Sequence, residues 1–480
     1  MSDTAFRPAA ELARMISSKE ISARELLEIH AARIEAHNLA LNAIVTLDLD
    51  AARAQADEAD AATARGESWG PLHGLPMTIK DSFEVAGMPS TGGAAELKDH
   101  VPDKDAEPVG CLRKAGAIII GKTNVPEYAG DWQSYNDIFG RTNNPWNLER
   151  TPGGSSGGAV AALSAGLVAA EIGSDIGGSI RVPANFCGLF GHKPSFGTVP
   201  NAGHIPPAPH GYGTADLAVS GPFGRSVEDL ELLMGLMSGA KSSDPALSVS
   251  YPPARPIKRV AVWAEDEFAP ADTEISDAVR GAAQALADSG VEVDFDARPA
   301  IGFQASHAIY LTILSSIISD GWHEKTLAFM AEHAAGAPDD ALDDLTLQAR
   351  GTVLTYSHYL GLNSRREAKK AAWAAFFESY DALLCPVTSV PAFAHDTERR
   401  VPDRRITVNG QDRPYRELLR WAGLATVAHL PASAAPVGLS AEGLPLGVQI
   451  VGPCQEDLTC LAVARLIEEA FGGFQPPALS

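Results

Sequence analysis

Apolar positions in the first 65 residues recur at helical spacing. The segment Ser22-Ala-Arg-Glu25 forms a capping box, in which two side chains bond the backbone N–H groups at a helix start. The apolar residues that follow at helical intervals are Leu26, Leu27, Ile29 and Ile34. A second, Ala-rich helix is predicted near residues 50–65. The pattern predicts helical packing in this part of the chain and no chemistry.

The pattern changes after Gly70, where short apolar runs alternate with helical segments. Strand-like runs occupy residues 77–81, 117–120, 259–263, 291–295, 382–386, 432–439 and 444–451. Helical segments are predicted at 108–114, 157–171, 226–237, 276–289, much of 301–380, and 457–471. Residues 201–213 form a Pro/Gly-rich loop that could border a pocket, and residues 391–412 look polar and irregular. Strands that alternate with helices predict an α/β fold with helices on both faces of the sheet.

Charge and cysteine content limit the classes of partner and the cellular compartment that we expect. The chain has 480 residues, 38 Lys and Arg against 60 Asp and Glu, and a net charge of −22. Nucleic-acid sites need clustered basic residues, so a nucleic-acid partner is not expected, and the Arg399–Arg405 region is interpreted as a solvated loop. The five scattered cysteines contain no C-x-x-C pair and suit a reducing compartment. We therefore expect a cytoplasmic monomer or homodimer with no membrane anchor, no metal and no cofactor.

Two glycine-rich turns hold the candidate chemistry. Gly153-Gly-Ser-Ser-Gly-Gly158 and Gly177-Gly-Ser179 flank an Ala-rich apolar segment. Glycine frees the backbone and lets N–H groups face a ligand, while each turn also presents a serine. A third segment, Gly116-Ala-Ile-Ile-Ile-Gly-Lys-Thr123, matches the letters of a phosphate-binding loop. Its variable positions are strand-like and Pro126 follows closely, so nucleotide binding is not predicted.

Three features together resemble the amidase signature family: Lys80 at a predicted strand end, Ser155 in GGSSGG, and Ser179 in SDIGGSIR. The resemblance covers residues 70–197 and recurs at 384–386 and 444–452. It implies an α/β fold with a large mixed β-sheet core, covered by helices on both faces. It also implies one amidase domain over residues 1–480. Its parts are a helical segment (1–65), a signature core (66–200), a variable substrate-lining region (201–400) and a C-terminal return to the core (430–480).

The resemblance also implies a role for each matching residue. Ser179 would be the nucleophile, Ser155 a bridging serine after a cis peptide bond from Gly154, and Lys80 the base. The backbone N–H groups of the oxyanion hole would come from Ile176, Gly177, Gly178 and Ser179. Asp175 and Arg181 match supporting positions. A serine hydroxyl becomes nucleophilic when a neighbour takes its proton, and lysine can do so only when burial or nearby positive charge keeps it neutral.

Three alternative interpretations compete with a stand-alone amidase. The first is another class of serine hydrolase, because Gly153-Gly-Ser-Ser-Gly157 fits the G-x-S-x-G nucleophile elbow and His429 could serve as its histidine. The residues before this motif, however, do not form the buried strand that the elbow requires. One branch of the family works as the A subunit of a tRNA amidotransferase and carries an Asp near the equivalent of Arg420. A degraded binding scaffold is the third alternative, against which the intact set of Lys80, Ser155 and Ser179 argues.

The predicted substrate is a relatively apolar amide, such as an aryl, alkyl or fatty acyl amide. No charged substrate reader is identifiable, and apolar or aromatic side chains could line the approach. The residues named for this role are Trp132, Tyr135, Ile205, Tyr212 and Trp421, with Tyr310, Ile313 and Trp322 as further candidates. Esters and carbamates (urethanes) remain open as substrates, because each forms its oxyanion at the same place.

Overall fold

The computed structural model describes residues 4–207, 209, 215–238 and 251–479. Its helices are α1 (Ala9–Ser17), α2 (Ala23–Leu41), α3 (Leu49–Ala64), α4 (Glu107–Lys114), α5 (Gly157–Ser164), α6 (Arg181–Cys187), α7 (Val227–Met237), α8 (Thr273–Asp288), α9 (Phe303–Ile318), α10 (Glu324–Gly336), α11 (Asp344–Thr352), α12 (Tyr356–Phe376), α13 (Leu419–Thr426) and α14 (Asp457–Phe471). Its strands are β1 (Ile44–Leu47), β2 (Pro76–Lys80), β3 (Ile118–Thr123), β4 (Tyr135–Asn136), β5 (Gly140–Arg141), β6 (Glu171–Asp175), β7 (Phe190–Lys193), β8 (Val219–Gly224), β9 (Arg259–Val262), β10 (Glu292–Asp294), β11 (Ala382–Pro386), β12 (Arg405–Val408), β13 (Gln411–Pro414), β14 (Ala432–Leu439) and β15 (Pro445–Val451).

In the described part of the chain, eight strands form one mixed sheet in the order β10-β9-β11-β15-β14-β7-β8-β6. β9 pairs in parallel with both β10 and β11, and the other pairs are antiparallel. The parallel pair β9–β10 with α8 between its strands confirms the predicted βαβ unit. Helices α6, α8 and α14 pack against β14 and β15, so the large helix-covered sheet of an α/β fold is confirmed.

A smaller sheet brings Lys80 to the site. β2 pairs in parallel with β3, and β1 pairs antiparallel with the other side of β3. Met77 of β2 also forms a parallel bridge with Ala170, immediately before β6. The two strands therefore run side by side in the same direction, and their carboxyl ends, Lys80 and Asp175, meet at one edge.

α5 is shorter than the sequence pattern predicts. The helix ends at Ser164, and the apolar residues that follow lead into β6 at Glu171, whereas the prediction extended the helix from 157 to 171. Every residue of α5 is buried, so the segment has no exposed polar face whose periodicity would show where the helix ends. The small residues are required by close packing, since a Cβ on Gly158 would lie 2.3 Å from the Asn124 nitrogen.

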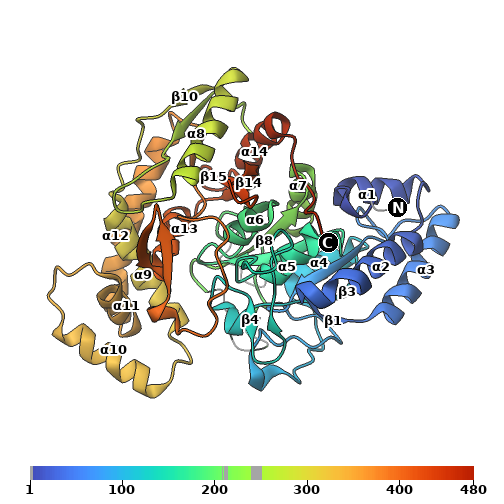
Figure 1. Cartoon of the computed structure of the whole chain (residues 1–480), viewed down its shortest axis with the longest axis horizontal. Coiled ribbons are helices and arrows are strands. Elements are labelled where there is room, and N and C mark those ends of the chain that lie inside the picture. Colours follow the sequence, from blue (N-terminus) through green and yellow to red (C-terminus); the bar gives the residue numbers. More distant parts are fainter. Residues whose placement is uncertain (1–3, 208, 210–214, 239–250, 480) are drawn as a thin grey trace.

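Other local predictions have mixed outcomes. The capping box of Ser22 and Glu25 is confirmed at the start of α2. The short strand β1 interrupts the predicted helical region, and the hairpin of β12 and β13 begins inside residues 391–412, a segment predicted to be irregular, and ends at Pro414. In Figure 1, helices α1–α3 (blue) lie at one end of the molecule and α9–α12 (gold to orange) at the other. α5 and α6, which follow the two glycine-rich turns, lie between these groups.

Candidate active site

Lys80 is the last residue of β2, and its side chain is fully buried. Its Nζ lies 2.7 Å from Ser155 Oγ and 2.9 Å from Ser174 Oγ. Ser155 belongs to the first glycine-rich turn, and Ser174 lies near the end of β6. The bridge between Met77 and Ala170 thus explains how Lys80 and Ser174, from separate segments, come together.

Burial lowers the pKa of Lys80 to about 7, because a buried ammonium loses its hydration. The carboxylates of Asp175 and Glu171 act in the opposite direction and raise that pKa. Burial in turn raises the pKa of Glu171 to about 7, which reduces its negative charge near neutral pH. A large share of Lys80 is therefore neutral near pH 7 and able to accept a proton.

The first turn places Ser155 against Lys80 with little freedom. The Gly154–Ser155 peptide bond is cis, which confirms the geometry implied by the sequence resemblance. A Cβ on Gly154 would lie 2.5 Å from the Asp131 carbonyl oxygen, so only glycine fits at this position. Ser155 is almost completely buried, and Lys80 is its side-chain hydrogen-bond partner among the described residues.

The second turn is fixed by hydrogen bonds to its carbonyl groups. Tyr310 donates its hydroxyl to the Ile176 oxygen at 2.9 Å, and Trp132 donates its indole N–H to the Gly177 oxygen at 2.9 Å. The Gly178 oxygen accepts from the Val182 N–H at 2.8 Å. In a trans peptide the N–H points away from the carbonyl, so each bond also sets the direction of the next residue's N–H.

Asp175 holds the inner side of this turn. Its carboxylate accepts from the backbone N–H groups of Gly178 at 2.9 Å and Ile180 at 3.1 Å. It also forms an ion pair of 2.8 Å with Arg181, whose side chain is likewise completely buried. The charge of Arg181 lowers the pKa of Asp175 to about 2 against the opposing effect of burial. Asp175 is therefore ionised and is held beneath the turn that carries Ser179.

Ser179 lies at the end of this turn, two residues before the start of α6. Gly178 precedes it with a φ of 97°, a conformation that favours glycine. Ser179 is 6% exposed, and its hydroxyl makes no hydrogen bond with any residue that the structure describes. Among Lys80, Ser155 and Ser179, Ser179 is therefore the least buried residue.

Comparison with known proteins identifies the family of this chain. The profile of the Amidase family matches residues 25–461. The chain belongs to the amidase family. The A subunit of the glutamyl-tRNA(Gln) amidotransferase of Synechococcus sp. (strain CC9902) is 34% identical to this chain, over 95% of each protein. Fatty-acid amide hydrolase 2-A of Danio rerio is 32% identical, over 98% of this chain and 89% of the relative. The crystal structure of a bacterial aryl acylamidase of the amidase signature family superposes with a TM-score of 0.80 at 28% identity, covering 97% of this chain and 96% of that one.

The side chains named as substrate-lining occupy different environments in this amidase-family fold. Trp132 lies at the second turn, and its ring packs edge-on against Tyr415 with centroids 5.3 Å apart. Tyr135 is bonded through its hydroxyl to Arg404 at 2.6 Å. Ile205 is fully buried, and Trp421 is fully buried with its indole N–H donating to the Ala269 oxygen. Tyr212 lies outside the described residues. A lining role for these side chains stays a prediction.

The further lining candidates and the remaining histidine and lysine also have defined positions. Ile313 is buried within α9, and Trp322 lies beyond the end of that helix.

His429 bonds Asp216 at 2.8 Å and Lys370 at 3.1 Å, and no described residue of the two turns is hydrogen-bonded to its ring. Lys122 lies within β3 and forms a buried ion pair of 3.1 Å with Asp81. A phosphate-binding loop needs a helix to open at this lysine, whereas Lys122 lies in a strand, as the sequence predicted; the absence of nucleotide binding stays a prediction.

Two residues at the site were not predicted from the sequence. Ser174 precedes Asp175 in the quoted motif, and His204 lies in the Pro/Gly-rich loop; their side chains are 2.8 Å apart. Alternation along β6 would have placed Ser174 and Ile172 on the same face, but nothing in the sequence indicates that residue 204 approaches it.

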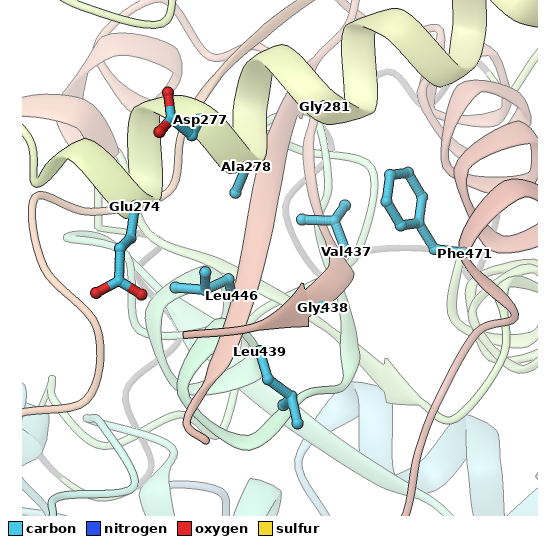
Figure 2. A pocket seen from close by; sticks show the side chains of 9 residues that line it. All are labelled: Glu274, Asp277, Ala278, Gly281, Val437, Gly438, Leu439, Leu446 and Phe471. Atoms are coloured by element: carbon cyan, nitrogen blue, oxygen red, sulfur yellow. The ribbon is translucent and has the colours of Figure 1, made fainter. Parts of the chain in front are cut away.

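Figure 2 shows a pocket of about 380 Å³ between α8 and β14. Its lining is mainly apolar on the strand side and includes two carboxylates on α8: Glu274, Asp277, Ala278, Gly281, Val437, Gly438, Leu439, Leu446 and Phe471. None of these residues belongs to the two glycine-rich turns or contacts Lys80.

Among the described residues, no group of three or more His, Cys, Asp or Glu side chains is arranged to hold a metal ion. Within the same ranges, no helix is long and apolar enough to cross a membrane.

Proposed function

We propose that this protein is a stand-alone amidase, a monomer or homodimer, that hydrolyses the C–N bond of apolar amides through an acyl-enzyme on Ser179. The observation that carries the proposal is the 2.7 Å contact between the buried Lys80 amine and Ser155, beside the turn that presents Ser179. Membership of the amidase family supports hydrolysis of C–N bonds. The aryl acylamidase with the same fold supports an apolar acyl or aryl substrate.

Acylation uses the three side chains as a proton relay. Neutral Lys80 takes the proton of Ser155, which takes the proton of Ser179 as its oxygen attacks the carbonyl carbon of the amide. The relay then runs in reverse and delivers a proton to the amide nitrogen, so that the C–N bond breaks and the amine leaves. Water attacks the acyl-enzyme with Lys80 again as the ultimate base, and the carboxylic acid is released.

Three backbone N–H groups are assigned to the developing oxyanion. Those of Ile176, Gly177 and Ser179 have no acceptor among the described residues, and the bonds to the turn's carbonyls fix the last two. Gly178 was also expected to donate, but its N–H is bonded to Asp175. We therefore give Gly178 the role of shaping the turn. Removing one oxyanion donor typically costs about 100- to 1000-fold in rate.

An aliphatic side chain next to Gly177 favours an apolar substrate. A Cβ on Gly177 would meet Leu419 Cδ2 at 3.1 Å and the Tyr310 hydroxyl at 3.4 Å. Leu419 begins α13, so this helix presents an aliphatic side chain to the turn. Arg420, the next residue, is directed elsewhere: it bonds the Phe268 oxygen and pairs with Glu417 at 3.1 Å. Aryl, alkyl and fatty acyl amides fit this arrangement, and carbamates or esters would use the same relay.

The second candidate is the role of an A subunit in an amidotransferase, which the 34% identity to such subunits favours. That role would require a partner chain and the release of ammonia from glutamine. The aliphatic Leu419 beside the turn offers no charge to read the ammonium of glutamine, and the net charge of −22 offers little to tRNA. We therefore rank this role second.

A labelling and turnover experiment tests the proposal. The purified protein is treated with a fluorophosphonate, which forms a Ser–O–P bond and releases fluoride, and the labelled peptide is identified by mass spectrometry. We expect the label on Ser179 and none in Ser179→Ala. Turnover is then measured with 4-nitroacetanilide, an aliphatic amide, a carbamate, an ester and glutamine. Turnover of glutamine alone, or activity that appears only with a partner chain, would favour the second candidate, whereas full activity of Ser179→Ala would overturn both.

A further inference from the structure

Ser174 and His204 extend the hydrogen bonds of Lys80 beyond Ser155. Ser174 Oγ lies 2.9 Å from Lys80 Nζ and 2.8 Å from His204 Nε2. His204 is brought there by backbone bonds to the segment that follows β2: the Ile205 N–H donates to the Ser82 oxygen at 2.7 Å, and the Glu84 N–H donates to the Gly203 oxygen at 2.9 Å. The ring of His204 also packs edge-on against Phe83, with centroids 5.0 Å apart.

The other ring nitrogen of His204 determines its tautomer. Nδ1 lies 2.8 Å from the Pro206 carbonyl oxygen, which can only accept a hydrogen bond, so Nδ1 carries the proton. Burial, followed by the charge of Lys80, lowers the pKa of His204 to about 4, so the ring is neutral near pH 7. Nε2 is therefore an acceptor. Of the two hydroxyls near it, Ser174 at 2.8 Å is closer than Ser82 at 3.1 Å.

The direction of the Ser174 hydrogen bond follows from this tautomer. Because Ser174 donates its only proton to His204, it can offer only lone pairs to Lys80. A neutral amine has two N–H donors and one lone pair. Once Ser174 occupies one N–H, the lone pair is available to the hydroxyl of Ser155, which must lose its proton in the proposed relay. If Ser174 could rotate, its own hydroxyl would compete with Ser155 for that lone pair.

We propose that His204 is a positioning residue that fixes Ser174 as an acceptor and thereby directs the Lys80 lone pair to Ser155. The proposal rests on the proposed function, because it takes Lys80 as the base. His204 contacts neither the substrate nor the reacting atoms; it acts through Ser174. The other ionisable groups around Lys80 are Asp175 and Glu171 on β6, while Lys122 on β3 is paired with Asp81. They remain unchanged in the variants below.

The pH profile of fluorophosphonate labelling separates this role from simple packing. In His204→Leu, Ser174 is released and donates to the neutral amine. We expect the plateau rate to fall about 10-fold or more while the midpoint of the profile stays near that of wild type, because the single lone pair of neutral Lys80 accepts from Ser174 in place of Ser155 and gains no further hydrogen bond. A packing defect that admits water would instead move the midpoint to higher pH, towards the ordinary pKa of lysine. Such an upward movement, or an unchanged plateau rate, would overturn the proposal.

Two further variants test the pathway through Ser174. His204→Gln can place an amide oxygen near the position of Nε2, so it should keep the wild-type midpoint and most of the plateau rate. His204→Asn is too short to reach Ser174 from the same backbone and should behave like His204→Leu; it replaces that variant if the latter does not fold. In a Ser174→Ala background, replacing His204 should cause no further loss of rate. Additive losses in this double-mutant cycle would contradict a role that acts through Ser174.

A remote buried histidine provides the matched control. His73 is also buried, and its Nε2 lies 2.8 Å from the Thr63 hydroxyl. This hydrogen bond is remote from the candidate site. His73→Leu should lower the thermal unfolding temperature without lowering the plateau rate or moving the pH midpoint. Ser179→Ala separates the two proposals: if it still labels at the wild-type rate, the proposed function fails. If it does not label and His204→Leu behaves like wild type, only the role of His204 fails.

Discussion

Asp175 and Arg181 form a completely buried ion pair, with Oδ1 and Nη2 2.8 Å apart, on either side of the residues that carry Ser179. Arg181 also donates to Gln449 Oε1 at 2.6 Å and to the Ala422 oxygen at 2.9 Å. One charge pair therefore connects the turn that carries Ser179 to β15 and α13. The turn's shape depends on the sheet through this pair, although the two residues are only six positions apart.

Asp175→Asn should destabilise the protein and disable the turn. The substitution leaves the buried guanidinium of Arg181 without its counter-charge, and breaking one partner of a buried pair typically costs about 3–5 kcal/mol. We expect a loss of that size in the free energy of unfolding, measured with urea, and a large fall in kcat. The control is Glu442→Gln, which removes the partly exposed pair with Arg150. Exposed pairs contribute about 1 kcal/mol or less, so equal losses in both variants would contradict the assignment.

Trp132→Phe isolates the hydrogen bond that holds the Gly177 carbonyl. The variant keeps an aromatic ring against Tyr415 but loses the indole N–H, and a hydrogen bond of this kind contributes about 1 kcal/mol. We expect kcat to fall roughly 5-fold or more, because the turn's carbonyls are less firmly held. Trp146→Phe is the matched control, since it loses a similar bond, at 3.1 Å to the Cys187 oxygen. A similar fall in kcat in both variants would show that the effect is not specific to the turn.

Much of the fold was predictable from local patterns. The capping box at Ser22, the strand that ends at Lys80 and the closing helix near 457–471 all depend on short-range spacing, and each occurs as predicted. The boundary between α5 and β6 was missed because burial on all sides removes helical periodicity, although Gly166, with a φ of 70°, marks the end of α5.

Only those residues of the candidate site that belong to sequence motifs were predictable. Lys80, Ser155 and Ser179 lie within recognisable segments, and the first two meet in the structure. The contacts of His204 and Tyr310 with the site depend on chain segments far away in sequence, so no local pattern reveals them. The hydrogen bond from Gly178 to Asp175 was hidden for another reason: a glycine motif indicates backbone freedom but not which N–H groups remain available.

The rate should rise with pH as Lys80 loses its proton. Burial lowers its pKa to about 7, and only the neutral amine can act as base, so kcat/KM is expected to be half-maximal near pH 7 and to fall about tenfold per unit below it. Burial also lowers the pKa of Lys193, to about 8, but the amine of Lys193 bonds the Pro194 oxygen. Lys193→Met should therefore keep the wild-type midpoint, whereas Lys80→Met should abolish turnover. A rate that is flat from about pH 6 to about pH 9, with chemistry limiting, would contradict a lysine base.

Lys122 should contribute to stability and not to nucleotide binding. Its amine is completely buried within 3.1 Å of Asp81, 2.9 Å of Ser90 Oγ and 2.8 Å of the Phe83 oxygen, so no donor remains for a phosphate. Lys122→Met leaves the carboxylate of Asp81 buried and unpaired, which should lower the free energy of unfolding by about 3–5 kcal/mol. The wild-type protein should show no rise in unfolding temperature with Mg-ATP, because only a ligand that binds the folded state stabilises it. A rise that increases with Mg-ATP concentration and is absent in Lys122→Met would restore the phosphate-binding interpretation of this segment.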